Sequence, residues 1–217
     1  MNITILDNKN KEFPQISQAL DDPNGLLAIG GDLSVERLIS AYHQGIFPWF
    51  DEDQPILWWS PDPRAILLPN EFRVNRTFRK LINKRQFQFT INQHFLKVIK
   101  ACADNRKVSG TWITSEMIEA YYQLHLAGFA QSVECYQNEQ LVGGLYGLRI
   151  GRVFFAESMF RLVDNASKMA LYFLCQHMIK TKGIMIDIQI ISPHLSNWGA
   201  KEISRDKYLA MIRANMN

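Results

Sequence analysis

Hydrophobic residues recur every three to four positions in three segments of the first part of the chain, which is the pattern of amphipathic helices. The pattern predicts helices over residues 35–45, 75–85 and 114–128. Thr114 stands at the start of the third segment, in the place of an N-cap. Gly45 and Gly128 end the first and the third, where a left-handed cap favours glycine.

After residue 130 the pattern changes to short runs rich in Val, Tyr and Phe, which is typical of strands. The runs are "QSVECY", "QLVGGLYGLRI" and "RVFFAES", and Gly151 and Arg152 join the last two as a tight hairpin would. They predict an antiparallel meander. A helix over residues 164–183, the strand "IMIDIQI" and a helix that opens at Ser204 follow. This order predicts a mixed α+β fold.

The segment Gly45–Pro69, "GIFPWFDEDQPILWWSPDPRAILLP", holds three tryptophans and five of the eight prolines. Because the ring of each proline fixes its backbone φ angle, we expect this segment to be stiff, and it separates the first part of the chain from the rest. We expect a small N-terminal domain over residues 1–62 and a larger domain over 63–217. So short a first domain would be marginally stable alone, so we expect it to dock on the second.

Charge is distributed unevenly along the chain, although the formal net charge is only +3. Residues 1–60 contain three Lys and Arg against nine Asp and Glu, whereas residues 71–107 contain ten against two. In "NRTFRKLINKR" five cations and no anion lie on a helix whose other face is apolar. A solvated surface helix would usually mix charges, so this stretch favours a ligand with a phosphate backbone.

Several kinds of site have no support in the sequence. Three widely separated cysteines and five scattered histidines form neither a disulfide framework nor a metal-ligand pattern. There is no nucleophile elbow, phosphate-binding Gly-Lys loop or dinucleotide fingerprint. The N-terminus lacks a leader pattern, and no apolar run reaches the ~18 residues of a spanning helix. We therefore expect a cytoplasmic protein that does not associate with membranes.

Three polar residues in the predicted sheet are candidates for chemistry. On "IMIDIQI", Asp187 and Gln189 share one face with attachment points roughly 6.6 Å apart, while the isoleucines share the other. An interior Asp needs a partner or a function, but a face open to solvent explains the pattern equally well. Glu157, in "FFAESMF", is expected where its strand ends, which suits a surface or a functional carboxylate.

Eight segments occur in a specific order along nearly the whole chain: "PNGLLAIGGDLSVERLISAYHQGIFPWF", "PILWWSPDPRAILLP", "GTWIT", "LVGGLYG", "FFAESMF", "NASKMAL", "IDIQ" and "HLSNWGA". In them the chain resembles the bacterial leucyl/phenylalanyl-tRNA protein transferases. The resemblance implies transfer of Leu, Phe and also Met from aminoacyl-tRNA to the α-amino group of proteins with N-terminal Arg or Lys, which marks them for N-end-rule degradation. It also implies a small N-terminal α/β domain docked on a C-terminal domain of the acyl-CoA N-acyltransferase (GNAT-like) type.

The resemblance also implies roles for individual residues. It implies that the catalytic residues are Asp187, Gln189 and Glu157. It implies that the terminal adenosine of the tRNA binds to Trp49 and Trp112. The residues implied to contact the tRNA backbone are Arg76, Arg79, Lys80, Lys84 and Arg85. The residues implied to line the pocket for the aminoacyl side chain are Leu145, Phe154, Met159, Leu171 and Ile186.

The chemistry of such a reaction agrees with these residues. An aminoacyl ester is already activated, so positioning supplies much of the acceleration and no cofactor or metal is expected. The attacking α-amine, with a pKa of about 7.7 to 8.0, needs only a modest base. Asp187 would accept from, orient or help to deprotonate this amine, directly or through Gln189 or water. Glu157 would hold the network or face the cationic residue of the acceptor protein. We expect a monomer, because the tRNA site needs no second subunit.

Two other hypotheses belong to different functional classes. A CoA-dependent N-acetyltransferase would share the fold, but "FRLVDNASK" lacks the glycines of its phosphate loop. An RNA-binding module without catalysis would explain the basic helix and the tryptophans, but not the inward-facing Asp187 and Gln189. Within "HLSNWGA", "SNW" stands where the transferases usually have "ASL", and this departure bears on the choice of acceptor protein.

Overall fold

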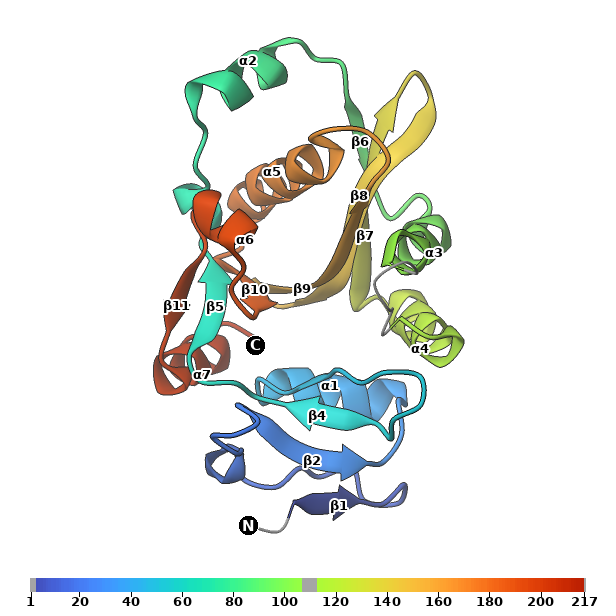
Figure 1. Cartoon of the computed structure of the whole chain (residues 1–217), viewed down its shortest axis with the longest axis vertical. Coiled ribbons are helices and arrows are strands. Elements are labelled where there is room, and N and C mark those ends of the chain that lie inside the picture. Colours follow the sequence, from blue (N-terminus) through green and yellow to red (C-terminus); the bar gives the residue numbers. More distant parts are fainter. Residues whose placement is uncertain (1–2, 107–112, 217) are drawn as a thin grey trace.

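The computed structural model describes residues 3–106 and 113–216, whose strands form two sheets (Figure 1). The smaller sheet has the strand order β1-β2-β4-β3, and the larger has β11-β5-β10-β9-β8-β7-β6. Helices accompany both sheets, so the predicted α+β class is confirmed. The strands are β1 (Thr4–Leu6), β2 (Leu26–Gly30), β3 (Phe47–Pro48), β4 (Leu57–Trp59), β5 (Arg64–Leu67), β6 (Gln88–Ile91), β7 (Ala130–Gln137), β8 (Gln140–Ile150), β9 (Val153–Arg161), β10 (Met185–Gln189) and β11 (Lys201–Ile203). The helices are α1 (Val35–His43), α2 (Arg76–Asn83), α3 (Phe95–Arg106), α4 (Ser115–Leu126), α5 (Ala166–Lys180), α6 (Pro193–Asn197) and α7 (Arg205–Arg213).

The larger sheet is mixed, because one of its strand pairs, β9 with β10, is parallel and the others are antiparallel. Strands β6 to β9 are antiparallel neighbours, as the predicted meander requires, and Gly151 makes the β8–β9 turn at φ 56°. Strand β10 then returns through α5 and pairs in parallel with β9. On its other edge β10 pairs antiparallel with β5. This pairing places the segment after the first domain directly beside the strand that carries Asp187.

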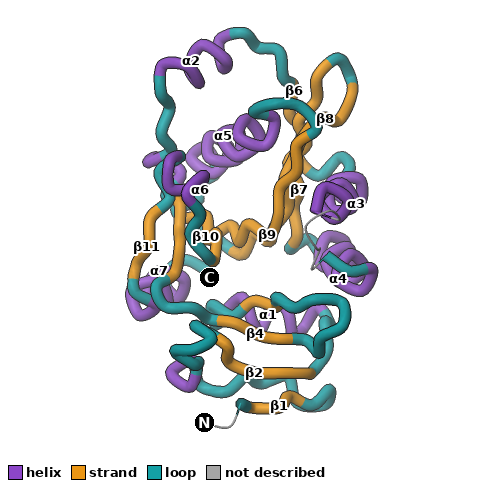
Figure 2. The backbone as a smooth tube through the Cα atoms, viewed as in Figure 1, coloured by secondary structure: helices purple, strands orange, loops and turns teal. Residues whose placement is uncertain are grey.

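Two hydrophobic clusters lie on opposite faces of the larger sheet, because successive strand residues point to opposite sides. Phe155 belongs to the first cluster, with α3, α4 and α7, whereas its neighbour Phe154 belongs to the second, beneath α5. Figure 2 shows α5 on one side of the curved sheet and α3 and α4 on the other. The sheet is therefore covered on both faces.

The first cluster also contains residues of the small sheet and of α1, so the small unit docks on the larger one through apolar contacts. Gly45 lies at this junction with φ at +75°, and a Cβ there would come within 2.8 Å of the Tyr208 ring and 2.9 Å of Leu209. A side chain at this position would thus be strained in the backbone and blocked by α7. The division expected between residues 62 and 63 falls in the segment that joins β4 to β5.

Three details differ from the sequence-based expectations. Helix α3 was not expected, although Phe95, Val98, Ile99 and Cys102 have helical spacing and are all buried. The strand of Glu157 does not end at that residue, because β9 continues to Arg161. The isoleucines of "IMIDIQI" do not share one face to the end.

Strand β10 has a register shift between Asp187 and Gln189. Gln189 adopts a left-handed conformation with φ at 57°, and the strict alternation of side chains stops there. Ile190 consequently lies beyond the strand and is 52% exposed. Among the described residues, no helix has the length and apolar character that crossing a bilayer requires.

Candidate active site

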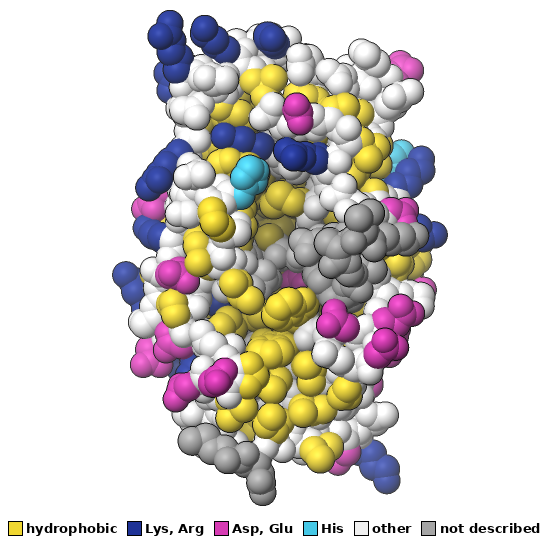
Figure 3. Space-filling view, in the orientation of Figure 1, with side chains coloured by type: hydrophobic (Ala, Val, Ile, Leu, Met, Phe, Trp, Pro, Cys, Tyr) yellow, Lys and Arg dark blue, Asp and Glu magenta, His cyan; other side chains and the backbone are white. Residues whose placement is uncertain are grey.

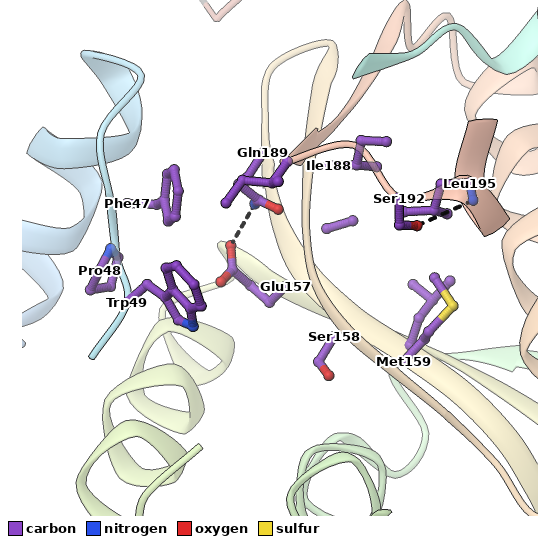
Figure 4. Close-up of a pocket in the computed structure, with 13 residues that line it drawn as sticks. Phe47, Pro48, Trp49, Glu157, Ser158, Met159, Ile188, Gln189, Ser192 and Leu195 are labelled. Carbon is purple, nitrogen blue, oxygen red and sulfur yellow. Dashed lines mark hydrogen bonds between the residues drawn. The ribbon is translucent and has the colours of Figure 1, made fainter. Parts of the chain in front are cut away.

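A cavity of about 280 Å³ lies between the small unit and the larger sheet (Figure 4). Strand β3 and Trp49 form one wall, β9 and the end of β10 form the floor, and the segment leading into α6 closes the far side. The lining residues are Phe47, Pro48, Trp49, Leu145, Ala156, Glu157, Ser158, Met159, Ile188, Gln189, Ile190, Ser192 and Leu195. Most of these side chains are apolar, and Glu157 is the carboxylate among them.

Glu157 reaches the cavity because it is the extra residue of a β-bulge. Across the β8–β9 pair, Tyr146 faces Ser158 and Gly147 faces Ala156, so Glu157 has no partner in the ladder. A bulge re-aims the side chain of its extra residue. Figure 4 shows the Glu157 carboxylate and the Gln189 amide directed toward each other beside the indole of Trp49.

Neutral donors surround the Glu157 carboxylate. The hydroxyl of Tyr42 donates to Oε1 over 2.7 Å, and that of Tyr121 to Oε2 over 3.0 Å. The Gln189 amide donates to Oε1 over 3.4 Å. Burial and the adjacent carboxylate charge raise the pKa of both phenols well above 10, so they remain protonated donors at neutral pH.

Removal from water is the main influence on Glu157 and raises its pKa from 4.5 to about 7. The two tyrosine hydroxyls oppose this shift because they stabilise the ionised form, and the charge of Asp187 adds to it. A carboxyl group that titrates near neutral pH can both accept and return a proton under physiological conditions. The environment of Glu157 therefore suits general acid–base chemistry.

Asp187 is held in a different way. It is fully buried and forms a bidentate ion pair with Arg64, from Nε to Oδ1 over 2.9 Å and from Nη2 to Oδ2 over 2.7 Å. The Tyr208 hydroxyl donates to Oδ2 over 2.7 Å, and the Gln189 backbone N–H to Oδ1 over 3.0 Å. Asp187 does not line the cavity. Because four donors occupy its oxygens, Asp187 is suited to hold neighbouring groups in position, above all the left-handed backbone of Gln189, rather than to contact a substrate.

Arg64 connects this ion pair to the cavity wall. Its guanidinium lies 4.7 Å from the ring centroid of Phe47, which lines the cavity, and 4.6 Å from that of Tyr208. Burial is the largest single influence on Arg64 and lowers its pKa, but the charge of Asp187, the hydrogen bonds to Asp187 and the nearby Tyr208 together raise that pKa above its usual value. Arg64 thus ties the strand of Asp187 to β3 of the small unit.

Trp49 and Trp112 are the tryptophans expected to bind the terminal adenosine. Trp49 lines the cavity and is 43% exposed, so its ring is open to a ligand. The Trp59 indole donates to the Trp49 carbonyl over 2.7 Å and so supports its backbone. Trp58 is fully buried and donates to the Gly30 carbonyl over 2.9 Å. Trp112 lies outside the described residues.

The structure brings together only part of the expected aminoacyl pocket. Leu145 and Met159 line the cavity, next to Ala156 and Ile188. The other three expected residues are buried in the second hydrophobic cluster and do not reach the cavity wall. They are Phe154, Leu171 and Ile186.

The expected basic helix is α2, which lies far from the cavity at the top of the molecule (Figure 1). Phe78 anchors it against Phe72 and Tyr172 with ring centroids 5.9 and 5.7 Å apart. All five expected tRNA-binding side chains are exposed, and none forms an ion pair with another described residue. Figure 3 shows Lys and Arg side chains gathered on this upper part and acidic ones mostly below the central hollow.

Sequence reasoning missed the partners of both carboxylates: Arg64, Tyr42, Tyr121 and Tyr208. Tyr42 and Tyr121 lie within the apolar pattern of their predicted helices, and Arg64 directly precedes the apolar run "AILL", so local sequence gives none of the three a polar role. One signal was available, since an interior Asp requires a cationic partner or donors. In the described ranges, 3–106 and 113–216, no group of three or more His, Cys, Asp or Glu could hold a metal ion.

Comparisons with known proteins agree with these features. The model of the family "Leucyl/phenylalanyl-tRNA protein transferase" matches residues 66–213, and that of its N-terminal domain matches residues 31–62. A leucyl/phenylalanyl-tRNA--protein transferase of Pectobacterium carotovorum subsp. carotovorum is 53% identical over 98% of this chain and 90% of that protein. One of Shewanella baltica is 50% identical over 99% of this chain and 91% of that protein.

Solved structures give more distant matches. A GCN5-related N-acetyltransferase from Kribbella flavida matches with a TM-score of 0.43 and 9% identity, over 76% of this chain and 60% of that one. A conserved protein of unknown function from Bacteroides thetaiotaomicron matches with a TM-score of 0.44 and 14% identity, over 94% and 70% of the two chains. These likenesses are weak, and the fold class rests on the strand order of this chain.

Proposed function

The chain belongs to the leucyl/phenylalanyl-tRNA protein transferase family and is an aminoacyltransferase, and on that premise we propose its substrates and the roles of its residues. It transfers Leu, Phe and Met from aminoacyl-tRNA to the α-amino group of proteins with N-terminal Arg or Lys, and so marks them for N-end-rule degradation. It acts in the cytoplasm, as a monomer and without a cofactor. The observation that carries the mechanism is the Glu157 carboxyl, which faces the cavity and titrates near neutral pH.

Glu157 is the group that handles the proton. The α-amine nitrogen of the acceptor protein attacks the ester carbonyl carbon, a C–N bond forms, and the bond from that carbon to the ribose oxygen breaks. The ionised Glu157 takes the proton that the amine loses and returns it to the departing ribose hydroxyl. Gln189, 3.4 Å from the same carboxylate, orients the amine. Asp187 and Arg64 are positioning residues that act through the Gln189 backbone.

The apolar wall explains why several side chains would be accepted. Leu145, Met159 and Ile188 offer methyl and thioether groups rather than fixed polar contacts. An apolar pocket discriminates by only about 1 to 3 kcal/mol per methylene, and a flexible Met adapts its shape. Leu, Phe and Met are therefore expected donors, whereas a charged side chain would lose its hydration without gaining a partner.

The uneven distribution of charge along the chain separates the binding of the tRNA from that of the acceptor protein. The terminal adenosine stacks on Trp49, which contributes about 1 to 3 kcal/mol per base, while α2 contacts the tRNA backbone without reading its sequence. The acidic small unit lies on the other side of the cavity from α2. An acceptor protein with a cationic first residue suits that side.

One experiment tests the proposal directly. The protein is incubated with radiolabelled Leu-tRNA and a polypeptide with N-terminal Arg, with and without ribonuclease, beside the same polypeptide with N-terminal Ala. Labelling that requires the Arg and is lost with ribonuclease supports the proposal. Trp49→Ala should reduce transfer at limiting tRNA, whereas Trp58→Phe, at a buried packing position, serves as the matched aromatic control. Labelling from acetyl-CoA instead, or tRNA binding without transfer, would contradict it.

A further inference from the structure

A second cavity, of about 320 Å³, adjoins the first. The two share Met159, Ser192 and Leu195, so these three side chains form a common wall. The rest of the second cavity is lined by Asn105, Phe160, Arg161, Ser167, His194 and Trp198. The two cavities are therefore direct neighbours.

The second cavity has the chemistry of a site for an anion with an aromatic part. Arg161 and His194 are exposed at it, and no carboxylate is among its described lining residues. The His194 ring lies 4.8 Å from that of Trp198, which gives the cavity an aromatic side. An arginine beside aromatic rings is a common arrangement for a phosphate and a base. The charge of Arg161 would repel the N-terminal Arg or Lys of an acceptor protein.

Further cations continue from the second cavity toward α2. The Lys168 ammonium lies 5.4 Å from the Trp198 ring centroid on one side and 4.3 Å from the Phe78 ring centroid on the other. Phe78 and Lys168 in turn line a third cavity together with Lys80 and Lys84. Figure 3 shows Lys and Arg side chains in two groups on the upper part of this face, one at about the height of α5 and one at the top around α2. Arg161, Lys168, Lys80 and Lys84 thus form what we name the cationic track.

From this continuity we propose that the second cavity binds the penultimate nucleotide of the aminoacyl-tRNA. Arg161 holds the phosphodiester that joins this nucleotide to the terminal adenosine, and the base lies against the His194 and Trp198 rings. The acceptor strand then follows the cationic track to α2. The inference rests on the proposed function, because it takes the terminal adenosine to lie against Trp49 in the first cavity.

Donors of increasing length test this inference. They are leucyl-adenosine, leucyl-cytidylyl-adenosine and Leu-tRNA, and kcat/KM for transfer to an Arg-peptide is measured with each. The wild-type protein should gain from the mononucleotide to the dinucleotide donor, since the second cavity becomes filled. Arg161→Gln should abolish that gain, a loss of about tenfold for one charge-assisted contact, and leave the mononucleotide donor unaffected. Lys80→Gln with Lys84→Gln should reduce use of Leu-tRNA alone.

Arg213→Gln, an exposed arginine on α7 remote from the three cavities, is the matched control and should change none of the three values. An equal loss with all three donors, or no loss with any, for Arg161→Gln would overturn the inference. Calorimetric affinities for cytidylyl-adenosine and adenosine give a second readout that needs no transfer. If no donor supports transfer, the proposed function fails, while equal affinities of the two nucleotides for the wild-type protein would overturn the subsite by itself.

Discussion

Glu157 and Asp187 occupy neighbouring strands of the same sheet, and their surroundings make them different groups. Asp187 pairs across the β9–β10 ladder with Phe155, two residues from Glu157. Around Asp187 a guanidinium and a phenol fill the space, and the contacts are 2.7 to 2.9 Å long. Around Glu157 the described residues provide two phenols and an amide but no cation in contact, and one side is open to the cavity.

The difference teaches that burial alone does not decide what a carboxylate can do. Arg64 compensates the lost hydration of Asp187 through a bidentate contact, and the Asp187 carboxylate in turn accepts from the Gln189 backbone N–H. The hydroxyls around Glu157 compensate only in part, so the pKa of Glu157 is raised to about 7. Asp187 is thereby suited to hold the backbone in position, and Glu157 is suited to transfer a proton.

The largest effect is expected from Glu157→Gln. The amide keeps the shape and can still accept from the tyrosine hydroxyls, but it cannot take a proton from the amine. Single-turnover transfer should fall by about 10² to 10⁴-fold, the usual contribution of a positioned base. The wild-type rate should also rise with pH through about 7, as the carboxyl ionises. The variant should lose this component and keep only the rise at about 7.7 to 8.0 that the α-amine of the acceptor causes.

Glu202→Gln is the control for this change, because Glu202 is an exposed carboxylate on β11 away from the cavity. It should retain the wild-type rate and pH profile. If Glu157→Gln transferred at the wild-type rate with the same rise near pH 7, another group would be the base and the contrast between the two carboxylates would lose its catalytic meaning.

Breaking the Asp187 ion pair should mainly affect stability. Asp187→Asn leaves Arg64 buried without its counter-charge, and Arg64→Met does the reverse, so each should lower the free energy of unfolding by about 3 to 5 kcal/mol. Replacing both, with Asp187→Leu and Arg64→Met, should restore part of the loss. Denaturant titration measures it.

Single-turnover transfer on the folded fraction then separates the two roles. Asp187→Asn should slow transfer less than Glu157→Gln does, since it acts through the position of Gln189. A loss of transfer equal to that of Glu157→Gln, at unchanged stability, would place Asp187 at the reacting atoms. An unchanged rate would remove even its positioning role.

The sequence predicts the elements of this site better than its contacts. Local hydrophobic period identifies the strands of Glu157 and Asp187, and the resemblance to the family selects both residues. The contact from Tyr42 to Glu157 spans 115 residues, and that from Arg64 to Asp187 spans 123. No local pattern encodes such distances. The bulge at Glu157 arises from the pairing of β9 with β8, which the sequence of β9 alone does not show. The sequence therefore could not indicate that the strand continues beyond Glu157.

A smaller effect is expected in the pH dependence of stability. Because the pKa of Glu157 is raised from 4.5 to about 7, the native protein holds a proton between these values that the unfolded chain has released. The free energy of unfolding of the wild type, relative to Glu157→Gln, should therefore fall as pH rises from 4.5 to 7 and stay level above 7. The fall should be below roughly 3 kcal/mol, since the half-buried side chain is partly screened by water. Thermal unfolding of the two proteins at matched pH measures it, and parallel curves would contradict the assignment.

The smallest effect separates the donors of the two carboxylates. Tyr121→Phe removes a hydrogen bond that favours the ionised Glu157, so the pKa of Glu157 should rise and the increase in transfer rate should move to higher pH. At pH 7 the rate should fall by about five- to tenfold, and it should recover in more alkaline buffer, because a hydrogen bond to a charged group contributes about 1.5 kcal/mol or somewhat more. Tyr208→Phe is the matched control, since its hydroxyl donates to Asp187. It should leave the pH profile in place and lower the melting temperature instead; a shifted profile in Tyr208→Phe would mean that the two carboxylates titrate as one unit.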